Sequence, residues 1–250
     1  MLEIKDVTKN FGGVSAVSHV SIKVEKGEIR GLIGPNGAGK STLFKLVSKV
    51  LKPDGGAISF DGAVITGFPS YRVARLGIGY VFQDSLLFGG MTLFENMLVC
   101  ANTAVNSGLL SLIPLYQGKE EKRLKERVRD VLEQFNLGTK AEFYPRQLSY
   151  GDQRRALIAR TVINGASLFL LDEPSAGMNA IEREELSKDI LEMRRQGHTI
   201  FIVEHNLRLI MGICDSISVL NFGKLIHEGT PKEVTSNAAV IEAYIGTKNG

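Results

Sequence analysis

The stretch Leu32–Ser41, LIGPNGAGKS, contains a complete G-x-x-x-x-G-K-[ST] pattern. The strand-like run EIRGLIG leads into it and a helical pattern begins at Lys40, which is the context that this pattern requires. Its glycines let backbone N–H groups point at phosphate oxygens, and the helix N-terminus adds partial positive charge. A glycine-rich turn that merely joins a strand to a helix is the alternative. The predicted phosphate-binding residues are Gly34, Pro35, Asn36, Gly37, Ala38, Gly39, Lys40, Ser41 and Thr42.

An acidic pair follows a second strand-like run, in SLFLLDEP, where Asp172 and Glu173 come directly after buried-type residues. In open parallel sheets, ligands bind beyond the carboxyl ends of the strands. We expect Asp172 and the Ser41 hydroxyl to hold Mg²⁺, while Lys40 reaches the β- and γ-phosphates. Glu173 is suited to polarise an attacking water. An acidic pair after a strand is often only a turn, and the phosphate loop upstream is what favours the functional interpretation.

Two further polar residues follow predicted strands. Gln83 comes after GYVF, where it can reach Mg²⁺ or the attacking water, although a glutamine there is usually a loop residue. His205 follows TIFIVE, where it could contact a γ-phosphate, although a lone histidine is more often structural. Both are predicted catalytic residues, and Gln83 is also a predicted metal ligand.

A second candidate anion site is LSYGDQRR, Leu148–Arg155. Ser149 is a natural N-cap for the helical pattern that follows. A serine hydroxyl, the Gly151 N–H and a helix dipole would converge on one point, which favours an anion. The alternative is a capped surface helix with no further role. Because this helix begins far beyond the phosphate loop, its anion need not be the one bound by the chain's own loop.

Composition bounds the remaining possibilities. The chain has 250 residues, 30 basic and 27 acidic, so its net charge of +3 does not favour nucleic-acid binding. Two distant cysteines, Cys100 and Cys214, are expected to be reduced thiols. The longest apolar stretch, Leu109–Tyr116, is too short to cross a bilayer, and the first residues do not resemble a signal peptide. Any membrane role is therefore expected to act through a partner.

Periodicity divides the chain into an α/β core and an insert. Near-continuous apolar runs such as SLFLL and TIFIV are typical of strands buried in a parallel sheet. We place the core at residues 1–82 and 164–250 and a helical subdomain at 83–163. In the insert, a charged helix is expected from about Lys119 to Phe135, with an apolar face. A helix over Lys40–Val50 is expected to bury Val50 with its other apolar residues.

Taken in order, GPNGAGKS, Gln83, LSYGDQRR, SLFLLDEP and His205 resemble the ATP-binding subunit of an ABC transporter over essentially the whole chain. The resemblance implies one ABC ATPase domain with ATP and Mg²⁺ as ligands. Its fold class would be α/β, a P-loop NTPase core with a mostly parallel sheet, an N-terminal antiparallel β part and an inserted helical subdomain. It also implies that Phe11, in NFGGVSAV, packs against the adenine.

The same resemblance implies that two such domains pair head to tail. Ser149, Tyr150 and Gly151 of one domain would then contact the γ-phosphate held by the other. The family's usual signature is LSGGQ, whereas here Tyr150 and Asp152 replace Gly and Gln, and Asp152 is expected to support the helix start. The following SAGMN segment ends in Asn179 where the family usually has Asp.

The YGDQ signature, the insert and the tail, namely Met211–Val234 and VIEAYIG at 240–246, resemble the branched-chain amino acid uptake group. The implied partners are a second ABC ATPase subunit, integral membrane permease subunits and, indirectly, a periplasmic or extracellular solute-binding protein, with no nucleic acid. The implied location is the cytoplasmic face of the cell membrane. One alternative is a soluble non-transport ABC-type ATPase, for example in iron–sulfur assembly. A second is a nucleic-acid-linked ABC ATPase, which would need two domains or a long coiled coil. A third is a non-hydrolysing nucleotide switch, which Glu173 disfavours.

Overall fold

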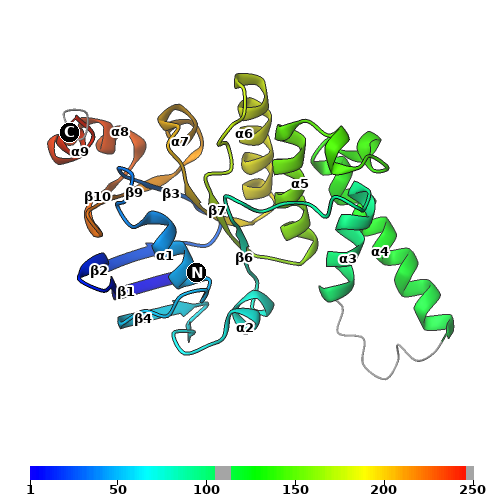
Figure 1. Cartoon of the computed structure of the whole chain (residues 1–250), viewed down its shortest axis with the longest axis horizontal. Coiled ribbons are helices and arrows are strands. Elements are labelled where there is room, and N and C mark those ends of the chain that lie inside the picture. Colours follow the sequence, from blue (N-terminus) through cyan, green and yellow to red (C-terminus); the bar gives the residue numbers. More distant parts are fainter. Residues whose placement is uncertain (105–113, 246–250) are drawn as a thin grey trace. The chain divides into compact units, whose positions relative to one another are not determined.

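The computed structural model describes residues 1–104 and 114–245 (Figure 1). Most of the apolar stretch Leu109–Tyr116 lies outside these residues. The chain divides into two compact units. The first, here called the sheet unit, comprises Met1–Phe82, Ser167–Pro174 and Ile190–Gly250. The second, the helical unit, comprises Gln83–Ala166 and Ser175–Asp189.

The larger sheet of the sheet unit has six strands in the order β10-β9-β3-β8-β7-β6. All of its pairings are parallel except that of the edge strand β10 with β9. Every residue of the neighbouring strands β7 and β8 is buried, as their apolar runs predict. The strands are β3 (Ile29–Ile33), β6 (Ile78–Val81), β7 (Leu168–Asp172), β8 (Thr199–Val203), β9 (Ser216–Asn221) and β10 (Lys224–Gly229).

The smaller sheet is antiparallel, with the order β2-β1-β4-β5. One hydrophobic core joins both sheets to helix α1 (Lys40–Val47), through side chains such as Leu2 and Ile58 from one sheet, Leu170 and Phe201 from the other, and Phe44 from the helix. The prediction for Val50 is wrong: α1 ends at Val47, and the Val50 side chain is 49% exposed. The strands are β1 (Leu2–Phe11), β2 (Val14–Val24), β4 (Gly55–Phe60) and β5 (Ala63–Val64).

Short helices complete the sheet unit, namely α2 (Ser70–Arg75), α7 (Leu207–Ile213), α8 (Pro231–Ser236) and α9 (Ala238–Ile245). Helix α6 (Ala180–Arg195) follows β7 in the chain and precedes β8. None of the helices within residues 1–104 and 114–245 has the length and apolar character needed to cross a membrane. The predicted fold class, with a mostly parallel sheet, an antiparallel N-terminal part and a helical insert, is confirmed.

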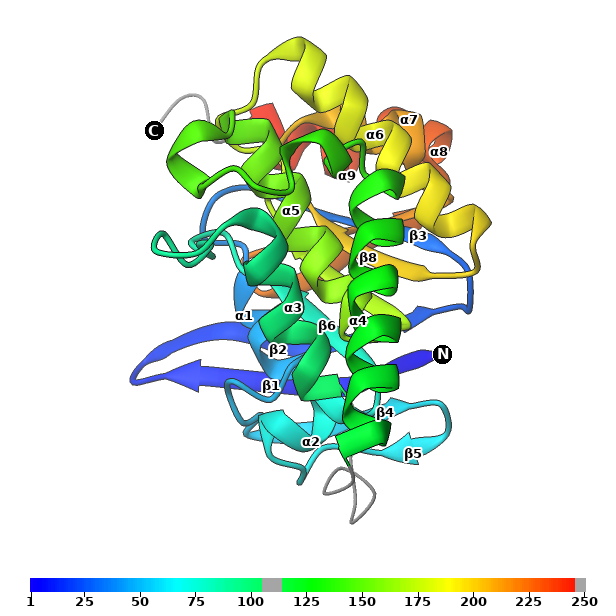
Figure 2. The same ribbon diagram turned by 90° about the vertical axis from the view of Figure 1, so that its right-hand side faces the viewer.

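The helical unit packs three helices against one another, α3 (Leu93–Ala104), α4 (Pro114–Gln134) and α5 (Tyr150–Ile163) (Figure 2). Short 3-10 turns, η2 (Gly138–Lys140) and η3 (Pro145–Gln147), precede α5. The charged helix begins at Pro114, earlier than the sequence predicts. Its expected apolar face is confirmed, because Val128, Val131, Leu132 and Phe135 are all buried.

A buried arginine ties α5 to the first half of α6 within the helical unit. The Arg155 side chain is buried, and its Nε lies 2.5 Å from Asp189 Oδ2. Its other nitrogens donate to Glu185 Oε2 at 2.9 Å and to the Phe135 carbonyl at 2.6 Å. Burial raises the pKa of Asp189, an effect that the Arg155 hydrogen bonds and charge oppose. Because each guanidinium nitrogen has an acceptor, this cluster holds α5 against the first half of α6.

In the sheet unit, glycines let the loop Gly34–Ser41 pass very close to neighbouring backbone. A Cβ on Gly34 would lie 2.1 Å from the Leu220 carbonyl oxygen, and one on Gly39 would lie 2.2 Å from that of Ala16. Gly39 also has φ +98°, a conformation that side-chain-bearing residues rarely adopt. Gly37 has φ +78° but open space around it. The loop is thus held between the β1–β2 hairpin and the end of β9.

We expect Gly39→Ala to destabilise the nucleotide-free protein more than Gly37→Ala. Both substitutions place a side chain on a backbone with positive φ, which costs about 1–2 kcal/mol of stability. Only the Gly39 variant also drives a methyl group into the Ala16 carbonyl oxygen. The difference should appear as a lower urea midpoint in circular dichroism. Equal midpoints for the two variants would show that the close approach to Ala16 does not constrain the loop.

We expect Arg155→Met to lower the free energy of unfolding by roughly 3–5 kcal/mol, because it strands the buried Asp189 carboxylate. The matched control is Arg195→Met, which breaks an exposed pair with Glu192 and should change stability by no more than about 1 kcal/mol. Urea unfolding followed by fluorescence and circular dichroism would measure both variants. A loss as small as that of the control would contradict the structural role of the cluster.

Candidate functional site

The phosphate loop connects the end of β3 to the start of α1, as predicted. Lys40, the first residue of α1, is buried, and its Nζ donates to the Gly34 and Pro35 carbonyl oxygens at 2.8 and 2.9 Å. Burial lowers the pKa of Lys40, while the nearby Glu173 and Asp172 carboxylates oppose that shift. The ammonium group therefore lies folded over the loop, against two of its carbonyl oxygens.

A cavity of about 200 Å³ opens over this loop. The β2 residue Ala16 contributes to one wall, and Glu173 and His205 line it as well. Seven consecutive residues of the predicted phosphate loop line the cavity, namely Asn36, Gly37, Ala38, Gly39, Lys40, Ser41 and Thr42. The remaining two predicted loop residues, Gly34 and Pro35, accept the Lys40 hydrogen bonds instead.

Asp172, the last residue of β7, is buried beside the loop. The Ser41 hydroxyl donates to its Oδ1 at 3.1 Å, and the Tyr80 hydroxyl donates to its Oδ2 at 2.8 Å. Burial raises the pKa of Asp172, and these two hydrogen bonds oppose the rise. Tyr80 was missed by sequence reasoning. It comes from the neighbouring strand β6, and only strand pairing brings it to Asp172.

Glu173 and His205 meet at the carboxyl ends of two adjacent strands. Asp172 pairs with Val203 in the parallel register of β7 and β8, so the residues that follow lie close together. Glu173 Oε1 is 2.7 Å from His205 Nε2. The Glu173 backbone has φ 50°, and its N–H donates to the Val203 carbonyl at 2.9 Å. A non-glycine residue held in this conformation at a cavity wall is characteristic of functional sites.

The oxygen donors beside the loop suit Mg²⁺ that arrives with phosphates. Within the described residues, no cluster of three or more His, Cys, Asp or Glu side chains could hold a metal ion by itself. Mg²⁺ prefers hard oxygen ligands and often takes one or two from the protein, with phosphates and waters supplying the rest. Asp172 and Ser41, already in contact with each other, provide such a pair.

Phe11 and Gln83 lie on exposed surface. Phe11 is the last residue of β1 and is 47% exposed, and Lys9 Nζ lies 5.6 Å from the centroid of its ring. It pairs with Val14 at the end of the β1–β2 hairpin, and Val14 precedes the cavity residue Ala16 by two residues. Gln83 is exposed in the loop after β6, at the start of the helical unit. Its reach toward Mg²⁺ or water remains a prediction.

The second candidate anion site lies in the helical unit at the start of α5. Ser149 is the N-cap, as predicted, with its hydroxyl accepting from the Asp152 N–H at 3.1 Å. Tyr150 is exposed and its hydroxyl accepts from Arg154. The Gly151 N–H donates to Glu182 Oε1 at 3.1 Å, a contact that sequence reasoning missed. Asp152 lies in the first turn of α5, as expected, and its carboxylate pairs with Lys140 Nζ at 2.5 Å.

Comparisons with known proteins agree with this geometry. The model of the ABC transporter family matches residues 17–176, and that of the branched-chain amino acid ATP-binding cassette transporter matches residues 224–248. The chain is 39% identical, over 98% of both chains, to the high-affinity branched-chain amino acid transport ATP-binding protein LivG of Salmonella typhimurium. It is 32% identical to the lipopolysaccharide export system ATP-binding protein LptB of Haemophilus influenzae, over 98% of this chain and 97% of that one.

A solved structure shows the same fold. The chain superposes on MJ1267, an ATP-binding cassette of an ABC transporter, with a TM-score of 0.87 and 31% identity over 98% of this chain and 99% of the other. The phosphate loop, the strand-end carboxylates and the capped α5 turn thus occur in a chain whose sequence and fold both match one family. The chain belongs to the ABC transporter family as an ATP-binding cassette, the ATPase subunit of such a transporter.

Proposed function

We propose that this chain hydrolyses ATP with Mg²⁺ as the motor subunit of a branched-chain amino acid importer, its 250 residues acting as one ABC ATPase domain. The observation that carries the catalytic proposal is the pair formed by Glu173 and His205. Their side chains lie 2.7 Å apart on the wall of the cavity that the phosphate loop lines. A carboxylate at that place is suited to polarise a water beside a bound γ-phosphate.

Within this proposal, the phosphate loop holds the triphosphate. Backbone N–H groups of Asn36–Ser41 and the α1 N-terminus meet the phosphate oxygens, and the Lys40 ammonium moves from the loop carbonyls to the β- and γ-phosphates. Asp172 and Ser41 hold Mg²⁺, which supplies charge neutralisation at the phosphates when it is bound. Tyr80 keeps the Asp172 carboxylate oriented through its hydrogen bond. Phe11 offers an exposed aromatic face to the adenine.

The three proposed catalytic residues, Glu173, His205 and Gln83, have different roles. Glu173 orients and polarises the attacking water, and His205 contacts the γ-phosphate and holds the Glu173 side chain. Gln83 links phosphate occupancy to the helical unit, whose first residue it is. Because Glu173 lines the cavity and its proposed role is to polarise water, exchanging its carboxylate for an amide should separate binding from turnover.

The site is completed in trans by a second cassette. Ser149, Tyr150 and Gly151 of one domain would close on the γ-phosphate held by the other. The support is the donor set at the start of α5, where a hydroxyl, a glycine N–H and a helix dipole lie together. Several charge-assisted hydrogen bonds, each worth roughly 1.5–3 kcal/mol, would hold the closed pair until hydrolysis.

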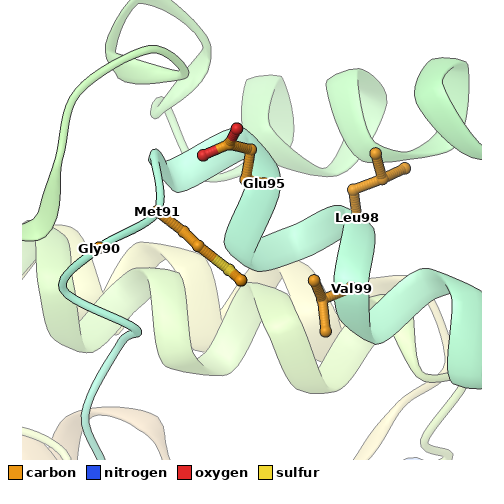
Figure 3. Close-up of a pocket in the computed structure, with 5 residues that line it drawn as sticks. All are labelled: Gly90, Met91, Glu95, Leu98 and Val99. Atoms are coloured by element: carbon orange, nitrogen blue, oxygen red, sulfur yellow. The ribbon is translucent and has the colours of Figure 1, made fainter.

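A permease is the proposed membrane partner, and the helical unit offers a place for it. A cavity of about 460 Å³ is lined by Gly90, Met91, Glu95, Leu98 and Val99 (Figure 3). Its lining comes from α3 and the loop before it, soon after Gln83 in the chain. An apolar segment of a permease loop would fill it. The cassette would then act at the cytoplasmic face of the cell membrane, and a solute-binding protein would take part only through the permease.

Branched-chain amino acids are the proposed cargo because two similarities coincide. The full-length similarity to LivG is higher than that to LptB, and residues 224–248 match the branched-chain amino acid cassette model. A soluble ATPase without a permease, as in iron–sulfur assembly, is the alternative. Purifying the tagged chain from native membranes in mild detergent tests this choice. A stoichiometric polytopic partner supports transport, whereas exclusively soluble partners contradict it.

We expect Glu173→Gln to bind ATP with unchanged affinity but to hydrolyse it at least about 100-fold more slowly, because the amide cannot polarise water. Phosphate release and nucleotide titration would be measured on the same preparation. Near-normal turnover by this variant would remove Glu173 from the catalytic role.

We expect Ser149→Arg, introduced into the Glu173→Gln protein, to block ATP-dependent pairing while leaving nucleotide binding intact. The arginine would fill the space where a partner's phosphate must approach. The control is Ser236→Arg, which adds the same charge at the exposed end of α8. Size-exclusion chromatography with light scattering would report pairing, and a dimer that persists in the Ser149 variant would contradict the in-trans site.

A further inference from the structure

Glu182, in the first turn of α6, uses its two carboxylate oxygens for different purposes. Oε2 accepts the Asn179 N–H at 3.0 Å, while Asn179 Oδ1 accepts the N–H groups of Ile181 and Glu182 at 2.9 and 3.0 Å. This is a reciprocal cap that begins α6. Oε1 instead accepts the Gly151 N–H at 3.1 Å, from the start of α5. All of these residues belong to the helical unit.

Helix capping does not account for the second oxygen. In the corresponding boxes of α3 and α8, Glu95 Oε2 accepts the Thr92 N–H, and Glu233 Oε2 accepts the Thr230 N–H and hydroxyl. Those carboxylates cap their own helices. Glu182 does the same with Oε2, and its Oε1 also accepts a hydrogen bond from another helix, α5. The contact with Gly151 therefore needs an explanation of its own.

The groups that surround Glu182 are those that would bind a phosphate. The Ser149 hydroxyl and the Gly151 N–H, at the positive end of the fourteen-residue helix α5, both hydrogen-bond to this carboxylate. The pKa of Glu182 is held below its ordinary value, first by the Asn179 N–H and then by the Gly151 N–H and the Ser149 hydroxyl. The side chain thus remains an anion at neutral pH.

A carboxylate and a γ-phosphate cannot both use these donors. The proposed function assigns the Ser149 hydroxyl and the Gly151 N–H to the partner's phosphate, and each N–H donates to one principal acceptor. Two anions a few ångströms apart also repel each other, more strongly where water is excluded. When the partner's ATP arrives, Oε1 must leave Gly151.

We propose that the Glu182 carboxylate occupies the second anion site of the open cassette in place of the γ-phosphate. The γ-phosphate of a partner's ATP then displaces it. This inference rests on the proposed in-trans site. Its consequence is a higher ATP requirement for pairing, because closure must first expel an anion. The cap on Asn179 retains the side chain nearby through Oε2, so that it can return when hydrolysis opens the pair.

The first test needs no partner. Glu182→Gln keeps a carbonyl oxygen to cap Asn179 but removes the charge, and we compare it with Glu233→Gln, which neutralises a capping glutamate in α8. The Gly151 amide is followed by NMR in glycine-labelled protein while inorganic phosphate is added. We expect a saturable shift in the Glu182 variant and none in the wild type or the control. A shift of equal size in wild type, or none in the Glu182 variant, would overturn the proposal.

The second test measures pairing in the Glu173→Gln protein by light scattering. We expect Glu182→Gln to reduce the ATP concentration for half-maximal dimer by roughly threefold to tenfold, corresponding to a fraction of one charge-assisted hydrogen bond. Glu233→Gln and Glu184→Gln, an exposed residue of the same helix, should leave it unchanged. A merely structural Glu182 would give the opposite result, a higher ATP requirement. If the Glu173→Gln protein does not pair at all, the in-trans proposal fails, and the phosphate titration still decides whether Glu182 fills the site.

Discussion

The close approach of the phosphate loop to its neighbours is the constraint on which the rest of the sheet unit depends. The loop backbone passes so near the Leu220 and Ala16 carbonyls that no side chain fits on Gly34 or Gly39. The Gly223 N–H donates to the Ala38 carbonyl at 3.1 Å, and the Ser18 N–H donates to the Gly223 carbonyl at 2.8 Å. These contacts join the loop, the β9–β10 turn and the antiparallel sheet. A rigid loop presents its N–H groups in one arrangement, so little ordering is left for the moment of binding.

The parallel register of the larger sheet then determines the chemistry at the loop. The pairing of Asp172 with Val203 brings Glu173 and His205 to the same edge. It also places a buried carboxylate and a cavity-lining one near the Lys40 ammonium, so that opposite charges are held in a region of low dielectric. In the proposed mechanism, the Lys40 cation would serve the phosphates, the Asp172 and Ser41 oxygens would serve the metal ion, and the Glu173 carboxylate would serve the attacking water.

In the helical unit, a carboxylate already contacts the donors at the start of α5 that we propose as a second anion site. The Arg155 cluster fixes α5 against α6 through buried charges, and Glu182 supplies an anion to the donors at the start of α5. Tyr150 packs toward Gly177, where an added Cβ would lie 3.0 Å from its ring. The unusual residues of this signature, Tyr150 and Asp152, therefore have local partners in Gly177 and Lys140.

Local sequence was sufficient for those features that depend on a short stretch of backbone. The phosphate loop, the Ser149 cap, the buried strands β7 and β8 and the apolar face of α4 could all be predicted, because each follows from spacing within one segment. The same reasoning misplaced Val50, since the end of α1 is set by a turn that periodicity does not reveal. Tertiary structure alone decided the partners of the site, namely Tyr80 on Asp172, Asp189 on Arg155 and Glu182 on Gly151. These pairs lie 92, 34 and 31 residues apart, and only strand register and helix packing, which short-range patterns do not encode, bring them within hydrogen-bonding distance.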